Sequence, residues 1–140
     1  MTELEHKRKA RRKQTAEDFT PIPLVDEMLS KLPSEVWAPD KSFLDNSAGN
    51  GNFLVRVLVR KLLHNHPPLQ ALSTIYGVEL MADNVEEMKQ RLLEALPELD
   101  EESKAKAIGI INSNIVCADA LTFDYENWRK PRNLQAKSLF

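Results

Sequence analysis

The chain has 140 residues, of which 42% are hydrophobic and 29% are charged, and its formal net charge is −2. This is the size and composition of one globular domain, which excludes wholesale disorder. The single cysteine, Cys117, excludes an internal disulfide and fits a reducing compartment, so a cytoplasmic location is expected. We expect neither a membrane span nor a secretory signal, because no apolar run approaches the roughly 18 residues of a span.

The mean charge hides an asymmetry, because basic residues gather near both ends of an acidic middle. They are Lys7, Arg8, Lys9, Arg11, Arg12, Lys13, Arg129, Lys130, Arg132 and Lys137. Basic arms on an acidic body suggest an anionic partner such as nucleic acid, and a solvated tail is the alternative. We therefore expect a basic flexible arm or frayed helix over 1–18, a folded domain over 19–128 and a basic tail over 129–140.

The folded part begins with a helix and a short strand. Apolar residues at helical spacing from Leu24 to Leu32 predict an amphipathic helix, with Thr20 as its N-cap and Pro33 at its end. Residues 42–45 then read as a buried strand. This strand runs into a turn rich in glycine and asparagine, the residues that tolerate positive φ.

Two further helix and strand units follow the turn. Residues 53–64 predict an apolar helix, ended by Pro67-Pro68, and residues 73–80 predict a second strand. Asp83, with Glu86 three residues later, predicts a capped helix. A polar loop with Pro97 separates that helix from a third strand over 114–119.

Alternation of helices and strands predicts parallel strands joined by helical crossovers. The expected fold class is α/β, one half of a doubly wound nucleotide-binding sheet with strand order 3-2-1. Ligands of such sheets bind at the carboxyl ends of the strands, where Asp45, Glu79 and Asp119 stand. Glu79 is placed to accept hydrogen bonds from ribose hydroxyls, and Asp119 from an adenine amine. Taken singly, each is more often a cap or a solvent-facing residue; together they predict a nucleoside site.

The sequence resembles a family at four places: Phe19-Thr20-Pro21, then Asp45-Asn46-Ser47-Ala48-Gly49-Asn50-Gly51-Asn52-Phe53, then Glu79, and then Ala118-Asp119-Ala120-Leu121. These stretches look like the N-terminal motifs of adenine-specific DNA methyltransferases of the restriction-modification type. The second stretch resembles the family's Asp-Pro-Ala-Cys-Gly-Ser-Gly-Gly-Phe loop. Asn46, Ser47, Ala48, Asn50 and Asn52 depart from that pattern, mostly to small residues that still suit a turn.

The resemblance implies a Rossmann-like methyltransferase fold that binds S-adenosylmethionine, with Thr20 near the methionine moiety. The cofactor-binding residues that it implies are Thr20, Pro21, Asp45, Ser47, Gly49, Gly51, Phe53, Glu79, Asp119 and Ala120. Phe53 offers an apolar surface to the ligand, although core packing is at least as common for such a residue. The implied reaction is methyl transfer to N6 of adenine in DNA.

One element of the family is missing from this sequence. No Asn-Pro-Pro-Tyr/Phe or Asp-Pro-Pro-Tyr motif is present, and the only adjacent proline pair, Pro67-Pro68, is misplaced for holding a flipped base. We therefore expect only the first half of the fold, no catalytic residue in this chain, and DNA as a partner of the intact enzyme.

Two other readings stay open. One is a non-catalytic S-adenosylmethionine-binding protein or a subunit that completes its sheet with another chain, and self-association through an exposed edge is the related expectation. The other is a methyltransferase for RNA or protein.

Three further residue types could form sites, histidine, cysteine and tryptophan. His64 and His66 could form half of a metal site but lack cysteine or carboxylate partners, so no metal is expected. Cys117 is read as a core residue. Trp37 and Trp128 are read as packing residues.

Overall fold

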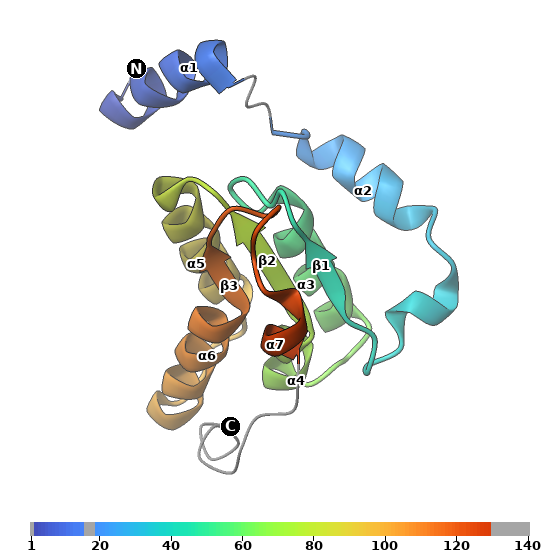
Figure 1. Ribbon diagram of the computed structural model, residues 1–140. Helices are drawn as coiled ribbons and strands as arrows, with labels where there is room; N and C mark the ends of the chain where they lie inside the picture. Colours follow the sequence, from blue (N-terminus) through green and yellow to red (C-terminus); the bar gives the residue numbers. More distant parts are fainter. Residues whose placement is uncertain (1, 16–18, 130–140) are drawn as a thin grey trace.

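A computed structural model describes residues 2–15 and 19–129. The elements run in chain order as α1 (Glu3–Thr15), α2 (Ile22–Ser30), η1 (Ser34–Trp37), β1 (Phe43–Asp45), α3 (Asn52–Leu63), α4 (Pro68–Ser73), β2 (Ile75–Glu79), α5 (Ala82–Ala95), α6 (Glu101–Asn114), β3 (Ile115–Cys117) and α7 (Tyr125–Arg129) (Figure 1). The expected basic tail lies outside the described residues, apart from Arg129 at the end of α7.

The three strands form one parallel sheet in the order β1-β2-β3, which confirms the predicted strand order. Phe43 pairs with Ile75, and Gly77 pairs with Asp45 on one side and Ile115 on the other. Each connection between neighbouring strands runs through two helices, α3 and α4 and then α5 and α6. The described residues thus have a mixed α/β architecture compatible with one half of a doubly wound sheet.

The core lies where α3 and α5 cross β2 at Gly77. A Cβ on Gly77 would stand 2.7 Å from Leu54 Cδ1, 3.2 Å from Ile115 Cδ1 and 3.4 Å from Met88 Sδ. The missing side chain therefore lets both helices pack closely on the strand. The largest fully buried apolar side chains are Leu54, Leu58, Leu72, Ile75, Met88, Leu92, Ile115, Val25 and Val78.

The opposite face of the sheet carries the short helix α7 (Figure 1). The ring of Trp128 packs edge-on against Tyr76 with centroids 4.9 Å apart, and its Nε1 donates to the Ser113 carbonyl at 2.8 Å. Leu44, which stands beside Tyr76 in the register, is 44% exposed. This face is therefore less covered than the one under α3 and α5.

All three predicted strands are present, but the helices α4, α6 and α7 and the 3-10 helix η1 were not predicted. The helix predicted over 53–64 does end before Pro67-Pro68, but the pair also begins a helix that was not predicted, because Pro67 is the N-cap of α4 and Pro68 is its first residue. Proline fits there because the first turn of a helix needs no donor from it. The loop predicted from Pro97 to the third strand is short, and α6 occupies most of that segment. The N-cap of α6, Asp100, accepts a hydrogen bond from Ser103 N at 2.7 Å.

Two predicted caps are corrected. The N-cap of α2 is Pro21 rather than Thr20, and α2 has no side-chain cap. The N-cap of α5 is Met81, so Asp83 lies inside the first turn and the capping box with Glu86 does not form. The carboxylate of Asp83 instead accepts from the N–H of its neighbour Asn84 at 3.0 Å.

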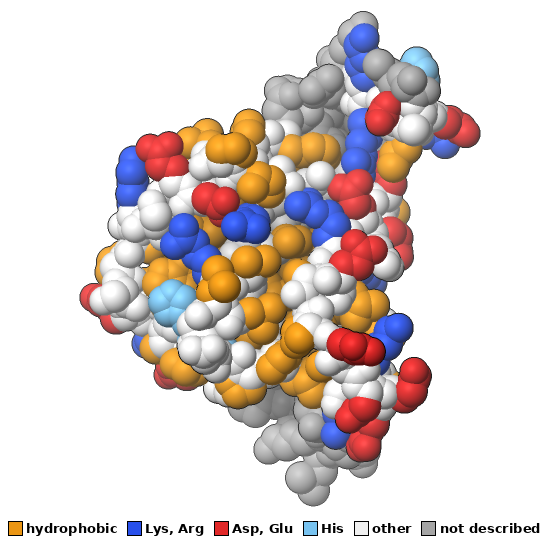
Figure 2. Space-filling view, turned by 180° about the vertical axis from the view of Figure 1, so that it is seen from behind, with side chains coloured by type: hydrophobic (Ala, Val, Ile, Leu, Met, Phe, Trp, Pro, Cys, Tyr) orange, Lys and Arg blue, Asp and Glu red, His pale blue; other side chains and the backbone are white. Residues whose placement is uncertain are grey.

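The basic N-terminal segment is helical over α1 and contacts α5 through Arg8. Charged side chains of both signs lie among apolar ones on the face shown in Figure 2. No helix within the described ranges combines the length and the apolar character that crossing a bilayer requires.

Candidate functional site

The carboxyl ends of the three strands meet at one edge of the sheet (Figure 1). Asp45 is the last residue of β1, Glu79 is the last residue of β2, and Asp119 follows the end of β3 by two residues. Asp45 pairs with Gly77, two residues before Glu79, so both carboxylates belong to the same face of the sheet. Beyond β3, Ala118 N donates to the Glu79 carbonyl at 3.0 Å, which keeps this loop beside β2.

The glycine turn links β1 to α3 and is fastened to β2. Gly49 and Gly51 have positive φ values of 55° and 93°, a conformation that favours glycine. Gly51 is the N-cap of α3, and a Cβ there would stand 2.7 Å from Met88 Cγ. Ala48 N donates to the Val78 carbonyl at 3.1 Å, so the turn lies against the end of β2.

Glu79 is the centre of the site, because three donors converge on its carboxylate. Oε1 accepts from Gly49 N at 2.9 Å, and Oε2 accepts from Met81 N at 3.0 Å and from Asn84 Nδ2 at 3.2 Å. A carboxylate has about four lone-pair sites, so about one site, on Oε1, stays available for a ligand in this conformation. The three donors also fix the plane of the carboxylate.

Asp45 lies close enough to Glu79 for their charges to interact. Burial raises the pKa of the Asp45 carboxyl, the hydrogen bond from Ser47 N at 3.0 Å lowers it, and the negative charge of Glu79 raises it again. The net pKa is higher than that of a free aspartate. Two neighbouring carboxylates in a partly buried place are typical of functional sites.

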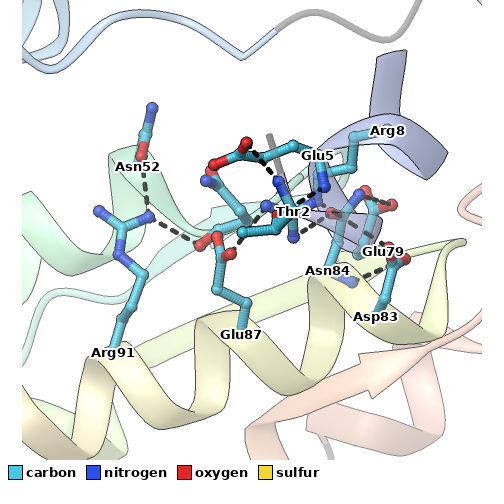
Figure 3. A network of polar contacts seen from close by, with 10 residues as sticks. Thr2, Glu5, Arg8, Asn52, Glu79, Asp83, Asn84, Glu87 and Arg91 are labelled. Atoms are coloured by element: carbon cyan, nitrogen blue, oxygen red, sulfur yellow. Dashed lines mark hydrogen bonds and ion pairs between the residues drawn. The ribbon is translucent and has the colours of Figure 1, made fainter. Parts of the chain in front are cut away.

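Arg91 of α5 ties the glycine turn to the Thr20 segment. Its Nη1 donates to the Asn50 carbonyl and to Asn52 Oδ1, both at 2.8 Å (Figure 3). Asn52 Nδ2 in turn donates to the Thr20 carbonyl at 2.7 Å. This link was not predicted from the sequence, because the turn and Arg91 are 39–41 residues apart in the chain.

Asn50 supplies a buried acceptor inside the same turn. Its Oδ1 is buried and has no hydrogen-bond partner among the described residues. A buried oxygen without a donor is costly and calls for an explanation, such as a ligand that donates to it. Sequence reasoning treated Asn50 only as a departure from a motif.

The other predicted site residues differ in how closely they approach Glu79. Pro21 caps α2, and Ser47 contributes its backbone N–H to Asp45. Phe53 packs against the hydrophobic core. Asp119 is exposed and its Oδ1 accepts from Leu121 N at 2.9 Å, while the Ala120 carbonyl accepts from Tyr125 Oη at 2.9 Å. The structure therefore brings Asp45 and Gly49 directly to Glu79, reaches Gly51 through the turn and Thr20 through Asn52, and holds Asp119 in its own turn.

The residues considered for other chemistry have packing partners. The rings of His64 and His66 are 6.2 Å apart, and Trp37 stacks on His64 at 6.1 Å. Burial lowers the pKa of His66, and the nearby charges of Lys61 and His64 lower it further. Among residues 2–15 and 19–129, no group of three or more His, Cys, Asp or Glu side chains could hold a metal ion. Cys117 is exposed rather than buried in the core.

The site as a whole offers acceptors to a ligand. Comparison with protein-family models, with curated proteins and with solved structures finds no match to this chain. The functional assignment therefore rests on the residues and their geometry.

Proposed function

We propose that this chain binds S-adenosylmethionine at the carboxyl ends of its parallel strands and is the cofactor-binding part of a DNA adenine-N6 methyltransferase. The observation that carries the proposal is the Glu79 carboxylate, fixed against the Gly49 turn with an acceptor site left on Oε1. A ribose hydroxyl that donates to this oxygen would form a charge-assisted bond, which typically contributes about 1.5–3 kcal/mol.

The chemistry of the site favours a nucleoside over a nucleotide. Asp45 and Glu79 place two carboxylates at the mouth of the turn, and they would repel a phosphate. The Gly49 N–H, which in a phosphate-binding turn would face the ligand, already donates to Glu79. S-adenosylmethionine carries no phosphate and has a positive sulfonium, so these two features suit it.

The remaining residues supply further acceptors. Asn50 Oδ1, buried without a partner in the described part of the chain, would accept from a donor of the ligand such as its amino group. Asp119 would accept from the adenine amine after its turn opens or through its second oxygen. When bound, S-adenosylmethionine supplies an electrophilic methyl group; these residues hold and orient it.

The DNA acceptor follows from the resemblance of the Thr20-Pro21 segment and the Asp45–Phe53 stretch to adenine-specific enzymes. The sequence given holds no motif for gripping the target base, so transfer to DNA is proposed for an enzyme in which this domain works with such a motif. An RNA or protein acceptor is the alternative within the same cofactor class.

Calorimetric titration of the chain with S-adenosylmethionine tests the proposal. The wild-type chain should bind, and Glu79→Gln should weaken binding about 10–100-fold, because a charged acceptor becomes neutral. Glu94→Gln is the matched control, since Glu94 is an exposed residue on the same helix as Asn84. The proposal is contradicted if titration of the folded wild-type chain with S-adenosylmethionine gives no heat of binding and S-adenosylhomocysteine does not compete for the site.

A second candidate is a binding subunit that completes its sheet with another chain. The observation that favours it is the outer edge of β1, which pairs with no other strand among the described residues. A chain that binds the cofactor only together with a partner would favour this candidate, whereas binding by the monomer favours a self-sufficient module.

A further inference from the structure

Arg8 of α1 is embedded in the polar network on the first turns of α5 (Figure 3). Its Nη1 donates to Glu87 Oε1 at 2.7 Å, its Nη2 donates to Asn84 Oδ1 at 3.0 Å, and its Nε lies 3.9 Å from Asp83 Oδ2. The Arg8 side chain is only 19% exposed. Such a well-enclosed guanidinium differs from the solvated cation that a basic arm would present.

Asn84 links this guanidinium to Glu79. It is fully buried, and its amide accepts from Arg8 through Oδ1 while it donates to Glu79 Oε2 through Nδ2. Rotating the amide by half a turn would point Oδ1 at the carboxylate and the NH₂ group at the guanidinium, and both contacts would be repulsive. Arg8 therefore fixes the orientation in which Asn84 donates to Glu79.

Arg8 also contacts the glycine turn through an aromatic ring. Its guanidinium lies over Phe19 at 5.6 Å from the ring centroid, and the ring edge stands 2.9 Å from where a Gly49 Cβ would be. One side chain of α1 thus supports two of the three groups that donate to the Glu79 carboxylate, the amide of Asn84 and the turn at Gly49.

We propose that Arg8 is a positioning residue for ribose recognition: through Asn84 it holds the Glu79 carboxylate with the remaining acceptor site of Oε1 directed at a ribose hydroxyl. The proposal rests on the proposed function, because it concerns the same site. It assigns the basic residue Arg8 to the cofactor site rather than to a nucleic-acid surface.

The test compares two ligands, S-adenosylhomocysteine and its 2′,3′-dideoxy analogue, by calorimetric titration of the full chain. The wild-type chain should prefer the ligand with hydroxyls. Arg8→Ala should weaken binding of S-adenosylhomocysteine about 3–10-fold and leave the analogue unchanged, because a loosened Asn84 affects only the carboxylate that meets the hydroxyls. A merely structural role of Arg8 would weaken both ligands alike.

Two more variants complete the design. Arg8→Lys should recover part of the preference, because an ammonium can still donate to Asn84. Glu87→Gln loosens Arg8 without touching Asn84 and should shift the preference in the same direction by less; it serves if Arg8→Ala fails to fold. Lys7→Ala is the matched control, since Lys7 pairs with the exposed Glu3 on the same helix.

The outcomes separate the two proposals. If the wild-type chain binds neither ligand, the proposed function itself fails. If it binds both equally, cofactor binding stands, but the ribose contact of Glu79 and with it the positioning role of Arg8 are overturned. If the wild-type chain prefers the ribose ligand but Arg8→Ala and Glu87→Gln keep the wild-type preference, or raise it, the positioning role of Arg8 is overturned while the function stands.

Discussion

At the scale of single residues, Asp45 and Glu79 place two hydrogen-bond acceptors together at a cost in folding stability. The pKa of Asp45 is raised mainly by its burial and secondarily by the charge of Glu79. Such a pair lowers the stability of the folded chain at neutral pH, and a site retained at a cost in stability is typical of a binding function.

Asp45→Asn should therefore stabilise the chain and weaken cofactor binding. A raised folded-state pKa means that the carboxylate destabilises the fold above that pKa, and that this penalty disappears as the pH falls toward 3.8, the unfolded value. The variant should unfold at a higher temperature than the wild type at pH 7, and the difference should shrink near pH 4. Thermal unfolding, followed by circular dichroism, measures the difference in unfolding temperature between variant and wild type at pH 7 and near pH 4. A variant that melts below the wild type at pH 7 contradicts the argument.

At the scale of elements, close packing of α3 and α5 on β2 depends on Gly77. Gly77→Ala should destabilise the chain by about 1–3 kcal/mol, the usual cost of overpacking, because the new Cβ meets Leu54 at 2.7 Å. Gly109→Ala is the opposite case, since a Cβ there meets nothing within 4 Å inside α6. It should stabilise by about 0.5–1 kcal/mol. Urea unfolding of both variants measures the sign and the size of the change in unfolding free energy. Equal changes in the two variants would contradict the close packing of α3 and α5 on β2 at Gly77.

The strands were predictable because each is a short apolar run that ends in, or leads into, a polar turn. Helix α6 was missed since its start, Asp100 onward, is as polar as a loop, although buried Ala107, Ile110, Ile111 and Asn114 stand at helical spacing. Helix α4 was missed because a proline pair was taken only as a stop signal, whereas proline also suits the first turn.

The candidate site likewise has features that the sequence predicts and features that it does not. The shared edge of Asp45 and Glu79 follows from parallel topology, which the order of elements predicts. The contacts of Arg91 and Arg8 could not be predicted, because they join residues far apart in the chain through side-chain geometry. The contact of Asn84 with Glu79 spans only five residues, but it depends on where α5 begins. Arg8 and Asn84, for example, are 76 residues apart. Nothing local in a run of lysines and arginines indicates which of them turns inward.

At the scale of the whole molecule, the sheet has one well-covered face and one thinly covered face next to an unpaired strand edge. Leu44 on β1 is 44% exposed, and the outer edge of β1 has no strand partner among the described residues. Backbone groups of such an edge can pair with another chain.

We expect the chain to self-associate weakly as its concentration rises. Leu44→Lys should keep it monomeric, because a charge on an edge strand opposes pairing. Leu121→Lys is the matched control, since Leu121 is 94% exposed but lies in the loop after β3. Sedimentation velocity over a concentration series, with a reductant present, measures the difference. Association through the outer edge of β1 is contradicted by a wild-type chain that stays monomeric throughout, or by a Leu121→Lys variant that also dissociates.

The reductant matters because of Cys117, the one thiol in the sequence, which is exposed and stands opposite Glu79 in the strand register. A maleimide dye will attach at this single point, at the end of β3 beside the proposed cofactor site. Native protein can thus be labelled without engineering, and the dye will sense a ligand arriving next to it. Air oxidation would instead join two copies through a disulfide at the same position, which the reductant prevents.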